Sequence, residues 1–211
     1  MNMLSNVAKE TEHEAGGVVK GVAIATVTQN QDPDKLCRVK VRFPWHENST
    51  ESYWARLATP MAGDDRGLVV IPEVGDEVLV AFEREDLRFP YVLGALWGKD
   101  KPPKDNSDGN NDERMFKSRK KHFLLFNDGS KGSVELAHEK GRKVLLDDDG
   151  IVVKDEKGNS VKIDSNANSI TIEAVGSLKI KAASITIEAT GTLDLKASGT
   201  LGLRGSLVNI N

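Results

Sequence analysis

Residues 169–211 repeat a pattern of about eight residues, and this repeat restricts the possible folds of the chain more than any other feature. The clearest unit, Ser-Ile-Thr-Ile-Glu-Ala, occurs at 169–174 and again at 184–189. Apolar residues occupy the second and fourth positions of the units, and Ala or Gly occupies the sixth. Looser versions with acidic turns lie at 143–150 and 151–158, so the repeat region begins at residue 143.

Each unit predicts one short strand followed by a corner of small residues. Side chains alternate along a strand, so Ile170 and Ile172 share one face while Thr171 and Glu173 share the other. All eleven aromatic residues lie at or before Phe126, so any core in this region consists of aliphatic side chains. A single strand with one apolar face cannot bury that face alone, and the repeat therefore needs further strands against it.

Two architectures would bury the repeated apolar face. A single chain could coil as a three-sided solenoid, but residues 143–211 supply fewer than three turns of three units, and such folds usually need at least three repeats. Alternatively, three identical chains could wind together, each forming one side of a triangular prism. We favour this intertwined trimeric β-helix, a shaft of roughly 40 Å at the usual strand spacing. Its predicted trimer core is Ile170, Ile172, Leu178, Ile180, Ile185, Ile187, Leu193, Leu195, Leu201, Leu203, Val208 and Ile210.

Residues 17–98 have the pattern of a separate small β domain. Alternation over 36–43 and 77–82 places one set of side chains in a core: Cys37, Val39, Val41, Phe43, Val78, Val80 and Phe82. Turn residues separate these segments from further strands expected near 17–27, 53–58, 67–71 and 91–96. Five or six short strands in this length favour a small barrel of the oligonucleotide/oligosaccharide-binding (OB) type, with no helix. The chain is thus predicted to be all-β.

Two other segments complete the predicted organisation. Residues 1–16 form an N-terminal segment without an apolar stretch, so we expect no secretory signal and synthesis in the cytoplasm. Residues 99–142 begin as a polar linker and continue into a collar hairpin that pairs 122–126 with 133–137. The basic cluster at 117–121 is interpreted as a charged strand edge or a contact within the trimer collar.

We expect no catalytic, cofactor or metal site. Cys37 is the single cysteine and has the alternation of a core residue. The four histidines (His13, His46, His122 and His138) are far apart in sequence and lack the spacing of metal ligands. The acidic run at 147–149 is interpreted as a solvated turn, and no apolar run is long enough to span a membrane. A net charge of −3 argues against a general polyanion binder.

Specific segments of the chain resemble one family. Pro72–Phe82, followed by Pro90–Trp97, is similar to the OB domain of the phage baseplate assembly protein V and VgrG-like spike family. Supporting segments are 38–45 and 54–60, and the repeat region is similar to the triple-stranded β-helix of that family. The order of the two parts along the chain is also that of the family.

The resemblance implies a homotrimeric central spike of a contractile injection machine: a phage tail, a type VI system or a related extracellular particle. Such a spike is assembled into a baseplate, contacts the target membrane transiently and pierces the envelope. No hub region precedes the OB domain, and the chain ends at Asn211 without a His-x-His apex. We therefore expect a separate hub protein above the OB domain and a separate PAAR-like tip protein at the C-terminal end.

Two other functions remain open from the sequence. One is a cell-wall hydrolase with an unrecognised pair of carboxylates. The other is an OB protein that binds nucleic acid, although residues 1–98 carry 10 basic and 15 acidic residues, the wrong balance for a phosphate backbone.

Overall fold

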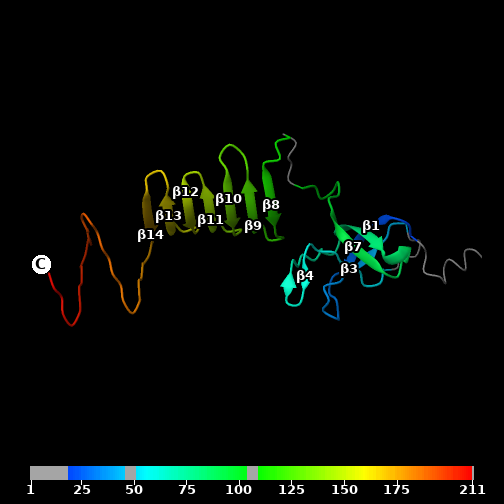
Figure 1. Cartoon of the computed structure of the whole chain (residues 1–211), viewed down its shortest axis with the longest axis horizontal. Coiled ribbons are helices and arrows are strands. Elements are labelled where there is room, and N and C mark those ends of the chain that lie inside the picture. Colours follow the sequence, from blue (N-terminus) through cyan, green and yellow to red (C-terminus); the bar gives the residue numbers. More distant parts are fainter. Residues whose placement is uncertain (1–18, 46–50, 104–108, 211) are drawn as a thin grey trace, which may run out of the picture. The chain divides into compact units, whose positions relative to one another are not determined.

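The computed structural model describes residues 19–45, 51–103 and 109–210, and it divides into two compact units, Met1–Ser107 and Asp108–Asn211 (Figure 1). The described residues are almost entirely strand, turn and extended chain, which confirms the all-β prediction. Among the same residues, no helix has the length and apolar character that a membrane span requires.

The first unit is built on a five-stranded sheet with the order β2-β1-β6-β7-β3. All neighbours are antiparallel except β3 and β7, which are parallel. Hydrogen bonds in both directions between Val39 and Ala55 join the segments next to β2 and β3, the two edges of the sheet, and curl it into a barrel of the OB type. The strands are β1 (Val22–Gln29), β2 (Lys40–Arg42), β3 (Arg56–Leu57), β6 (Glu77–Phe82) and β7 (Pro90–Leu96).

The core of this unit consists mainly of small β-branched residues. Alternate residues of β1 and β6 point inward, and Val27, Val39, Val41, Val78 and Val80 are fully buried. Phe43 and Phe82 close one end of the core, with ring centroids 5.5 Å apart. The alternation in the sequence is therefore confirmed for every predicted core residue except one.

The exception is Cys37, which is exposed rather than buried. Its backbone has φ 56°, so the chain turns there and the alternation begins only at Val39. The cause is Asp32, whose carboxylate accepts backbone N–H bonds from Asp34, Leu36 and Arg38 and folds 32–38 into a loop. The prediction of a core cysteine is wrong because a side chain six residues before Arg38 organises this segment.

Two local features of the first unit also differ from the prediction. The strand expected at 67–71 is replaced by a short hairpin of β4 (Ala62–Gly63) and β5 (Arg66–Gly67), after which Leu68–Val70 are exposed and outside any strand. A single 3₁₀ turn, η1 (Glu83–Glu85), connects β6 to the loop before β7, where no helix was expected.

The second unit contains a seven-stranded antiparallel sheet in which each strand pairs with the next strand in sequence. Its strands are β8 (Glu113–Lys117), β9 (Phe123–Asn127), β10 (Ser133–Ala137), β11 (Lys143–Asp147), β12 (Gly150–Lys154), β13 (Ser160–Asp164) and β14 (Ser169–Glu173). Pairing of β9 with β10 confirms the predicted hairpin. The sheet continues across residue 142, where we expected the shaft to begin, and the domain boundaries stay a prediction.

Residues 174–210 continue from β14 as extended chain, drawn in orange to red in Figure 1. No strand is assigned within this described stretch. At its start, the Val175 backbone N–H donates to Asn159 Oδ1 at 2.9 Å. The later repeat units therefore lack the ladder of hydrogen bonds that stabilises the earlier strands.

Candidate functional site

One face of the seven-stranded sheet is apolar from β8 to β14, with Arg114 as its one charged residue. Residues directly opposite each other in an antiparallel register lie on the same face, so the pairing defines two rows. One row is Phe116, Leu124, Leu136, Val144, Val153, Val161 and Ile172. The parallel row is Arg114, Phe126, Val134, Leu146, Ile151, Ile163 and Ile170. We call these two rows the apolar face.

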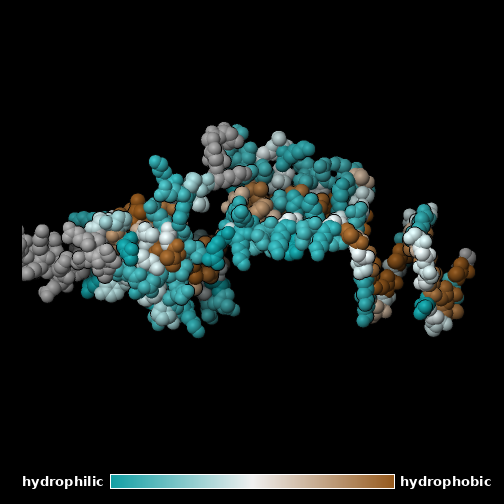
Figure 2. Space-filling view, turned by 180° about the vertical axis from the view of Figure 1, so that it is seen from behind, coloured by the Kyte–Doolittle hydropathy of each residue, from teal (hydrophilic) through white to brown (hydrophobic). Residues whose placement is uncertain are grey.

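The apolar face is uncovered in the single chain. Of its thirteen hydrophobic side chains, ten are exposed, from 38% for Ile151 to 70% for Ile170. The opposite face mixes apolar residues with charged and polar ones, and it includes an ion pair between Lys143 and Glu135 at 3.3 Å. In Figure 2, brown apolar atoms on the visible side of the sheet are bordered by teal hydrophilic atoms. A soluble monomer rarely leaves so many aliphatic side chains contiguous and exposed, so this face has the character of an interface.

Two of the twelve residues predicted for the trimer core lie on this face. Ile170 and Ile172 lie on β14, opposite Ile163 and Val161, and so form the last layer of the two rows. The other ten lie in 174–210, where their exposure runs from 49% for Val208 to 85% for Ile210. They keep the same i, i+2 spacing as the pairs in the sheet.

The sequence reasoning missed that the apolar rows begin at β8 and β9 rather than at Ile170. A signal was present, because pairs with i, i+2 spacing already occur at 124/126, 134/136, 144/146, 151/153 and 161/163. The turns between these strands vary in length, which hides the period of eight.

Two of the histidines, although far apart in sequence, lie side by side in the structure. The rings of His122 and His138 have their centroids 4.4 Å apart because β9 and β10 are neighbours. Each Nδ1 accepts a backbone N–H, from Glu139 and Lys140 respectively. His13 and His46 lie outside the described residues. Among the described residues, no three His, Cys, Asp or Glu side chains are gathered as a metal site would require.

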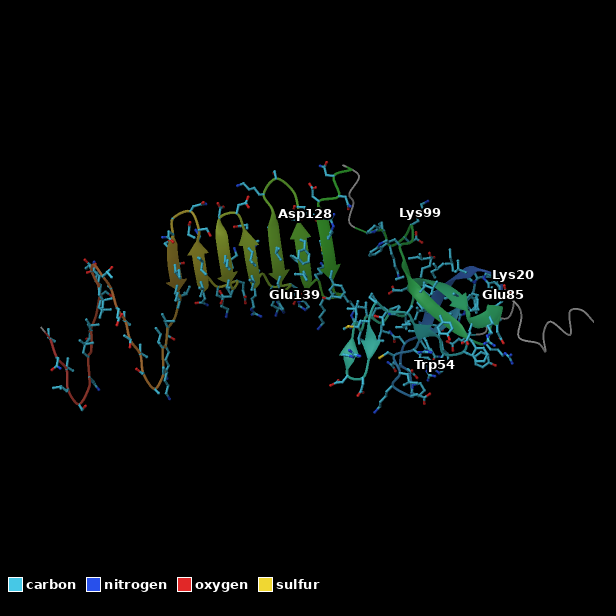
Figure 3. The ribbon with its side chains drawn as sticks, viewed as in Figure 1. Lys20, Trp54, Glu85, Lys99, Asp128 and Glu139 are labelled. Atoms are coloured by element: carbon cyan, nitrogen blue, oxygen red, sulfur yellow. The ribbon has the colours of Figure 1, made fainter. Side chains whose placement is uncertain are left out.

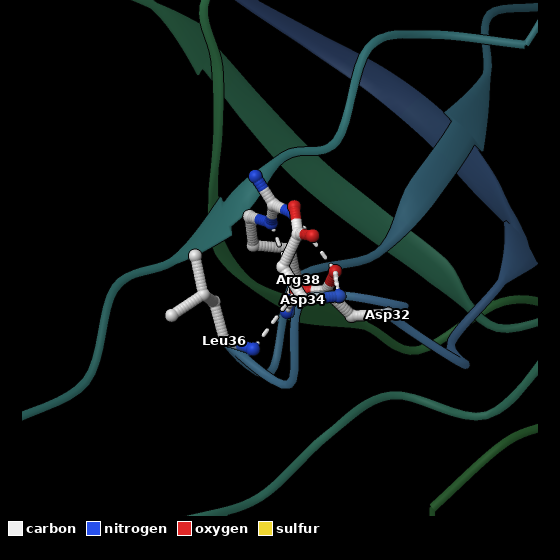
Figure 4. Close-up of polar contacts among 4 residues, drawn as sticks. All are labelled: Asp32, Asp34, Leu36 and Arg38. Atoms are coloured by element: carbon white, nitrogen blue, oxygen red, sulfur yellow. Dashed lines mark hydrogen bonds and ion pairs between the residues drawn. The ribbon is translucent and has the colours of Figure 1, made fainter.

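The most polar constellation of the first unit is the loop organised by Asp32 (Figure 4). Arg38 donates to both carboxylate oxygens of Asp32 at 2.8 Å and to Asp34 at 2.6 Å. The guanidinium, helped by the backbone N–H groups and opposed by desolvation, lowers the pKa of Asp32 well below its usual range. The same bonds raise the pKa of Arg38. The pair is a structural clamp beside the first strands rather than a reactive site.

Together these features define a class: an OB-type barrel followed by a β-rich segment with an uncovered aliphatic face. Residues 23–97 match the model of the type VI secretion system/phage-baseplate injector OB domain family. Residues 23–97 are therefore similar to the OB domain of that family, as the motifs at Pro72–Phe82 and Pro90–Trp97 predicted.

Curated relatives agree with this assignment. The chain is 39% identical over 87 residues to the type VI secretion system spike protein VgrG3 of Vibrio cholerae, and 36% identical over 89 residues to the spike protein VgrG4b of Pseudomonas aeruginosa. It is 34% identical over 87 residues to the actin cross-linking toxin VgrG1 of Vibrio cholerae. These matches cover 37–40% of this chain and 8–11% of the relatives, so the chain matches about a tenth of their length.

Proposed function

We propose that this protein is the homotrimeric central spike of a contractile injection machine, either a phage tail or a related secretion or extracellular particle. One observation carries the proposal: the apolar face of the sheet continues, with unchanged spacing, into a segment whose aliphatic side chains are all exposed in one chain. The spike relatives and the OB family support the same role.

The trimer is preferred to a solenoid because one chain leaves two needs unmet. Each exposed Ile or Leu would contribute about 1.5–3 kcal/mol on full burial. The backbone groups of 174–210 also need partners if the segment is to be buried, because buried N–H and C=O groups are almost always hydrogen-bonded. Three chains wound together would meet both needs, with strands of neighbouring chains stacked along the shaft and the aliphatic rows on the axis.

The role is mechanical. A prism with continuous interchain hydrogen bonds and a dry aliphatic axis would resist bending while the machine drives it through an envelope. The OB domains would form the collar beneath a hub protein, and the C-terminal end would carry a PAAR-like tip protein. Contact with the target membrane would then be brief, and the spike would be part of an assembled baseplate.

We infer a structural rather than an enzymatic protein. Two of the relatives are named as spike proteins, and the one named as a toxin is matched over 87 residues that cover 8% of its length. The similarity thus lies in the segment shared by spikes rather than in a catalytic part. A zymogram with peptidoglycan and pure protein tests this inference, and clear lysis would contradict it.

Solution mass tests the trimer. Light scattering at micromolar concentration should give three times the 23.0 kDa chain mass. Ile172→Asp combined with Ile187→Asp should abolish the trimer, because six carboxylates would meet on the axis without partners. The matched control, Thr171→Asp combined with Thr186→Asp, places the same charges at the outward positions and should remain trimeric. A well-folded wild-type monomer, or a trimer of the isoleucine variant, would overturn the proposal.

A further inference from the structure

The strands of the seven-stranded sheet end in two rows of turns, and the two rows carry opposite charge. Each row of turns is called an edge below, a term that does not refer to the outer strands β8 and β14. Because the sheet is a meander, successive turns lie on alternate edges: 118–122, 138–142 and 155–159 on one edge, and 128–132, 148–149 and 165–168 on the other. In Figure 3, Glu139 and Asp128 mark these two opposite ends of the strands.

The first edge is basic. Its turns and flanking strand ends hold nine basic residues and four acidic ones, a balance of +5. The basic residues are Lys117, Arg119, Lys120, Lys121, Lys140, Arg142, Lys143, Lys154 and Lys157. The acidic residues on this edge are Glu139, Asp155, Glu156 and Glu173. We call this the basic edge.

The second edge is acidic. It holds six acidic residues and Lys131 as its one basic residue in the sequence, a balance of −5. The acidic residues are Glu113, Asp128, Asp147, Asp148, Asp149 and Asp164. The basic cluster at 117–121 is therefore one part of a charge separation that runs along the whole sheet. We call this second edge the acidic edge.

Some of this charge takes part in ion pairs among the described residues. Arg142 pairs with Glu156 on the basic edge at 2.8 Å, while Asp164 pairs with Lys162 at 2.8 Å and Asp128 with Arg114. Lys140 and Asp148 are exposed at the tips of their turns. Like charges gathered along each edge repel one another, and an oppositely charged partner would relieve both edges.

We propose that the basic edge of each chain packs against the acidic edge of the next chain and so closes a threefold ring of three sheets. This inference rests on the proposed trimer and identifies the second surface that holds it together. Around a threefold axis with the apolar faces inward, contacts are head to tail, so one edge of each sheet meets the opposite edge of its neighbour. In such a contact, the basic edge of one chain would face the acidic edge of the next, so that opposite charges meet.

The turns also fit in height. Strands stack about 4.8 Å apart, so turns on one edge recur about every 9.6 Å and those on the other edge are offset by one strand. At equal height around a threefold axis, the basic turns at 138–142 and 155–159 would each lie between two acidic turns of the neighbouring chain, and the basic turn at 118–122 would lie next to the acidic turn at 128–132. The turn with Lys140, between β10 and β11, would then lie next to the turn with Asp148, between β11 and β12.

Cross-linking tests the contact directly. In full-length chains with Cys37→Ser, Lys140→Cys combined with Asp148→Cys should give covalent trimers with a short bismaleimide linker. Lys140→Cys combined with Lys157→Cys puts both thiols on the basic edge and should give no covalent trimer. A wild-type protein that is monomeric would remove the proposed function itself. A trimer in which the two pairs cross-link equally, or only the control pair does, would overturn this inference alone.

A charge swap gives an independent readout. Lys140→Glu and Asp148→Lys should each lower the stability of the trimer, raising the concentration for half-assembly in mild denaturant about 10-fold, since each contact occurs three times per trimer. The double swap should restore it to near the wild-type value, and 1 M salt should remove most of the differences. Additive effects of the two changes, with no recovery in the double swap, would contradict a contact between these edges.

Discussion

The two units of this chain use the same aliphatic residues in opposite circumstances. Val80, on β6 of the OB unit, is fully buried among neighbours from its own chain. Val153, on β12 of the second unit, also has an apolar residue two positions before it on the same face, but it is 46% exposed. Alternation therefore determines which side chains share a face, whereas the number of strands that can fold back determines whether one chain covers that face.

We expect the largest effect when the two units are produced as separate fragments. A fragment of residues 1–107 should fold as a monomer at any concentration, because its core is complete within the chain. A fragment of residues 108–211 should gain β structure only as it associates, with a folding midpoint that shifts with protein concentration. Circular dichroism and sedimentation over a hundredfold dilution would measure both. A concentration-independent, monomeric second fragment would contradict the distinction.

A glycine in the second unit should show the next largest effect. Gly150 begins β12 with φ 140°, and a Cβ there would collide with the backbone carbonyl oxygen of Ile163, which cannot move aside. Gly150→Ala should therefore destabilise the sheet by about 3 kcal/mol. Gly94→Ala in β7 of the OB unit is the control, since its Cβ would meet no atom within 4 Å and its backbone is ordinary.

Different probes distinguish these two changes. All three tryptophans lie in the OB unit, so their fluorescence reports on that unit, whereas far-ultraviolet circular dichroism reports on both. Gly150→Ala should alter the dichroism transition and leave the fluorescence transition in place. If the fluorescence transition shifted by the same amount, the two units would unfold together. That result would contradict the view that each unit is stabilised independently.

Much of the fold could be predicted from the sequence because buried and exposed residues alternate along its strands. The core valines of β6 and the hairpin of β9 with β10 follow from alternation and turn residues, and both are found. The repeat also identified Ile170 and Ile172 as members of one apolar face. In each case the signal lies within a few residues of the structure it predicts.

The parts that could not be predicted depend on longer-range or side-chain effects. Cys37 continues the alternation in sequence, but the bonds of Asp32 to later backbone N–H groups turn the chain before it. The start of the apolar face was missed because turns of unequal length break the period. The His122 and His138 contact required the pairing of β9 and β10 rather than any spacing between ligands.

Substituting one valine in each unit compares the two units directly, and we expect a moderate loss of stability from each change. Val80→Ala should lower the stability of the OB unit by about 2 kcal/mol, from lost burial and the cavity left behind. This loss should be the same at every protein concentration. Val153→Ala should leave the fluorescence transition unchanged and instead weaken assembly of the trimer. The loss in the fraction of chains that are trimeric should grow as the protein is diluted. Equal, concentration-independent losses for both variants would show that the apolar face is covered within one chain.

The smallest expected effect concerns the clamp of the OB unit, which should respond to pH rather than to concentration. Because Arg38 and three backbone N–H groups lower the pKa of Asp32 in the folded state, ionised Asp32 stabilises the fold fully above its unfolded pKa of about 3.9. That contribution is lost as the pH falls from there toward the folded pKa. Asp32→Asn should thus lower the fluorescence midpoint at pH 7 by less than Val80→Ala does, and the gap to wild type should narrow below about pH 4.

Asp34→Asn is the control for the clamp, because Asp34 is 67% exposed and contributes a single bond to Arg38. It should change the midpoint less than Asp32→Asn at pH 7. A gap between wild type and Asp32→Asn that stays constant from pH 7 to pH 3 would mean that the clamp acts through its shape and not through its charge. The OB unit would then resemble the second unit, because both would be stabilised by packing alone. The remaining difference would be that the OB unit packs against its own chain, whereas the second unit packs against other chains.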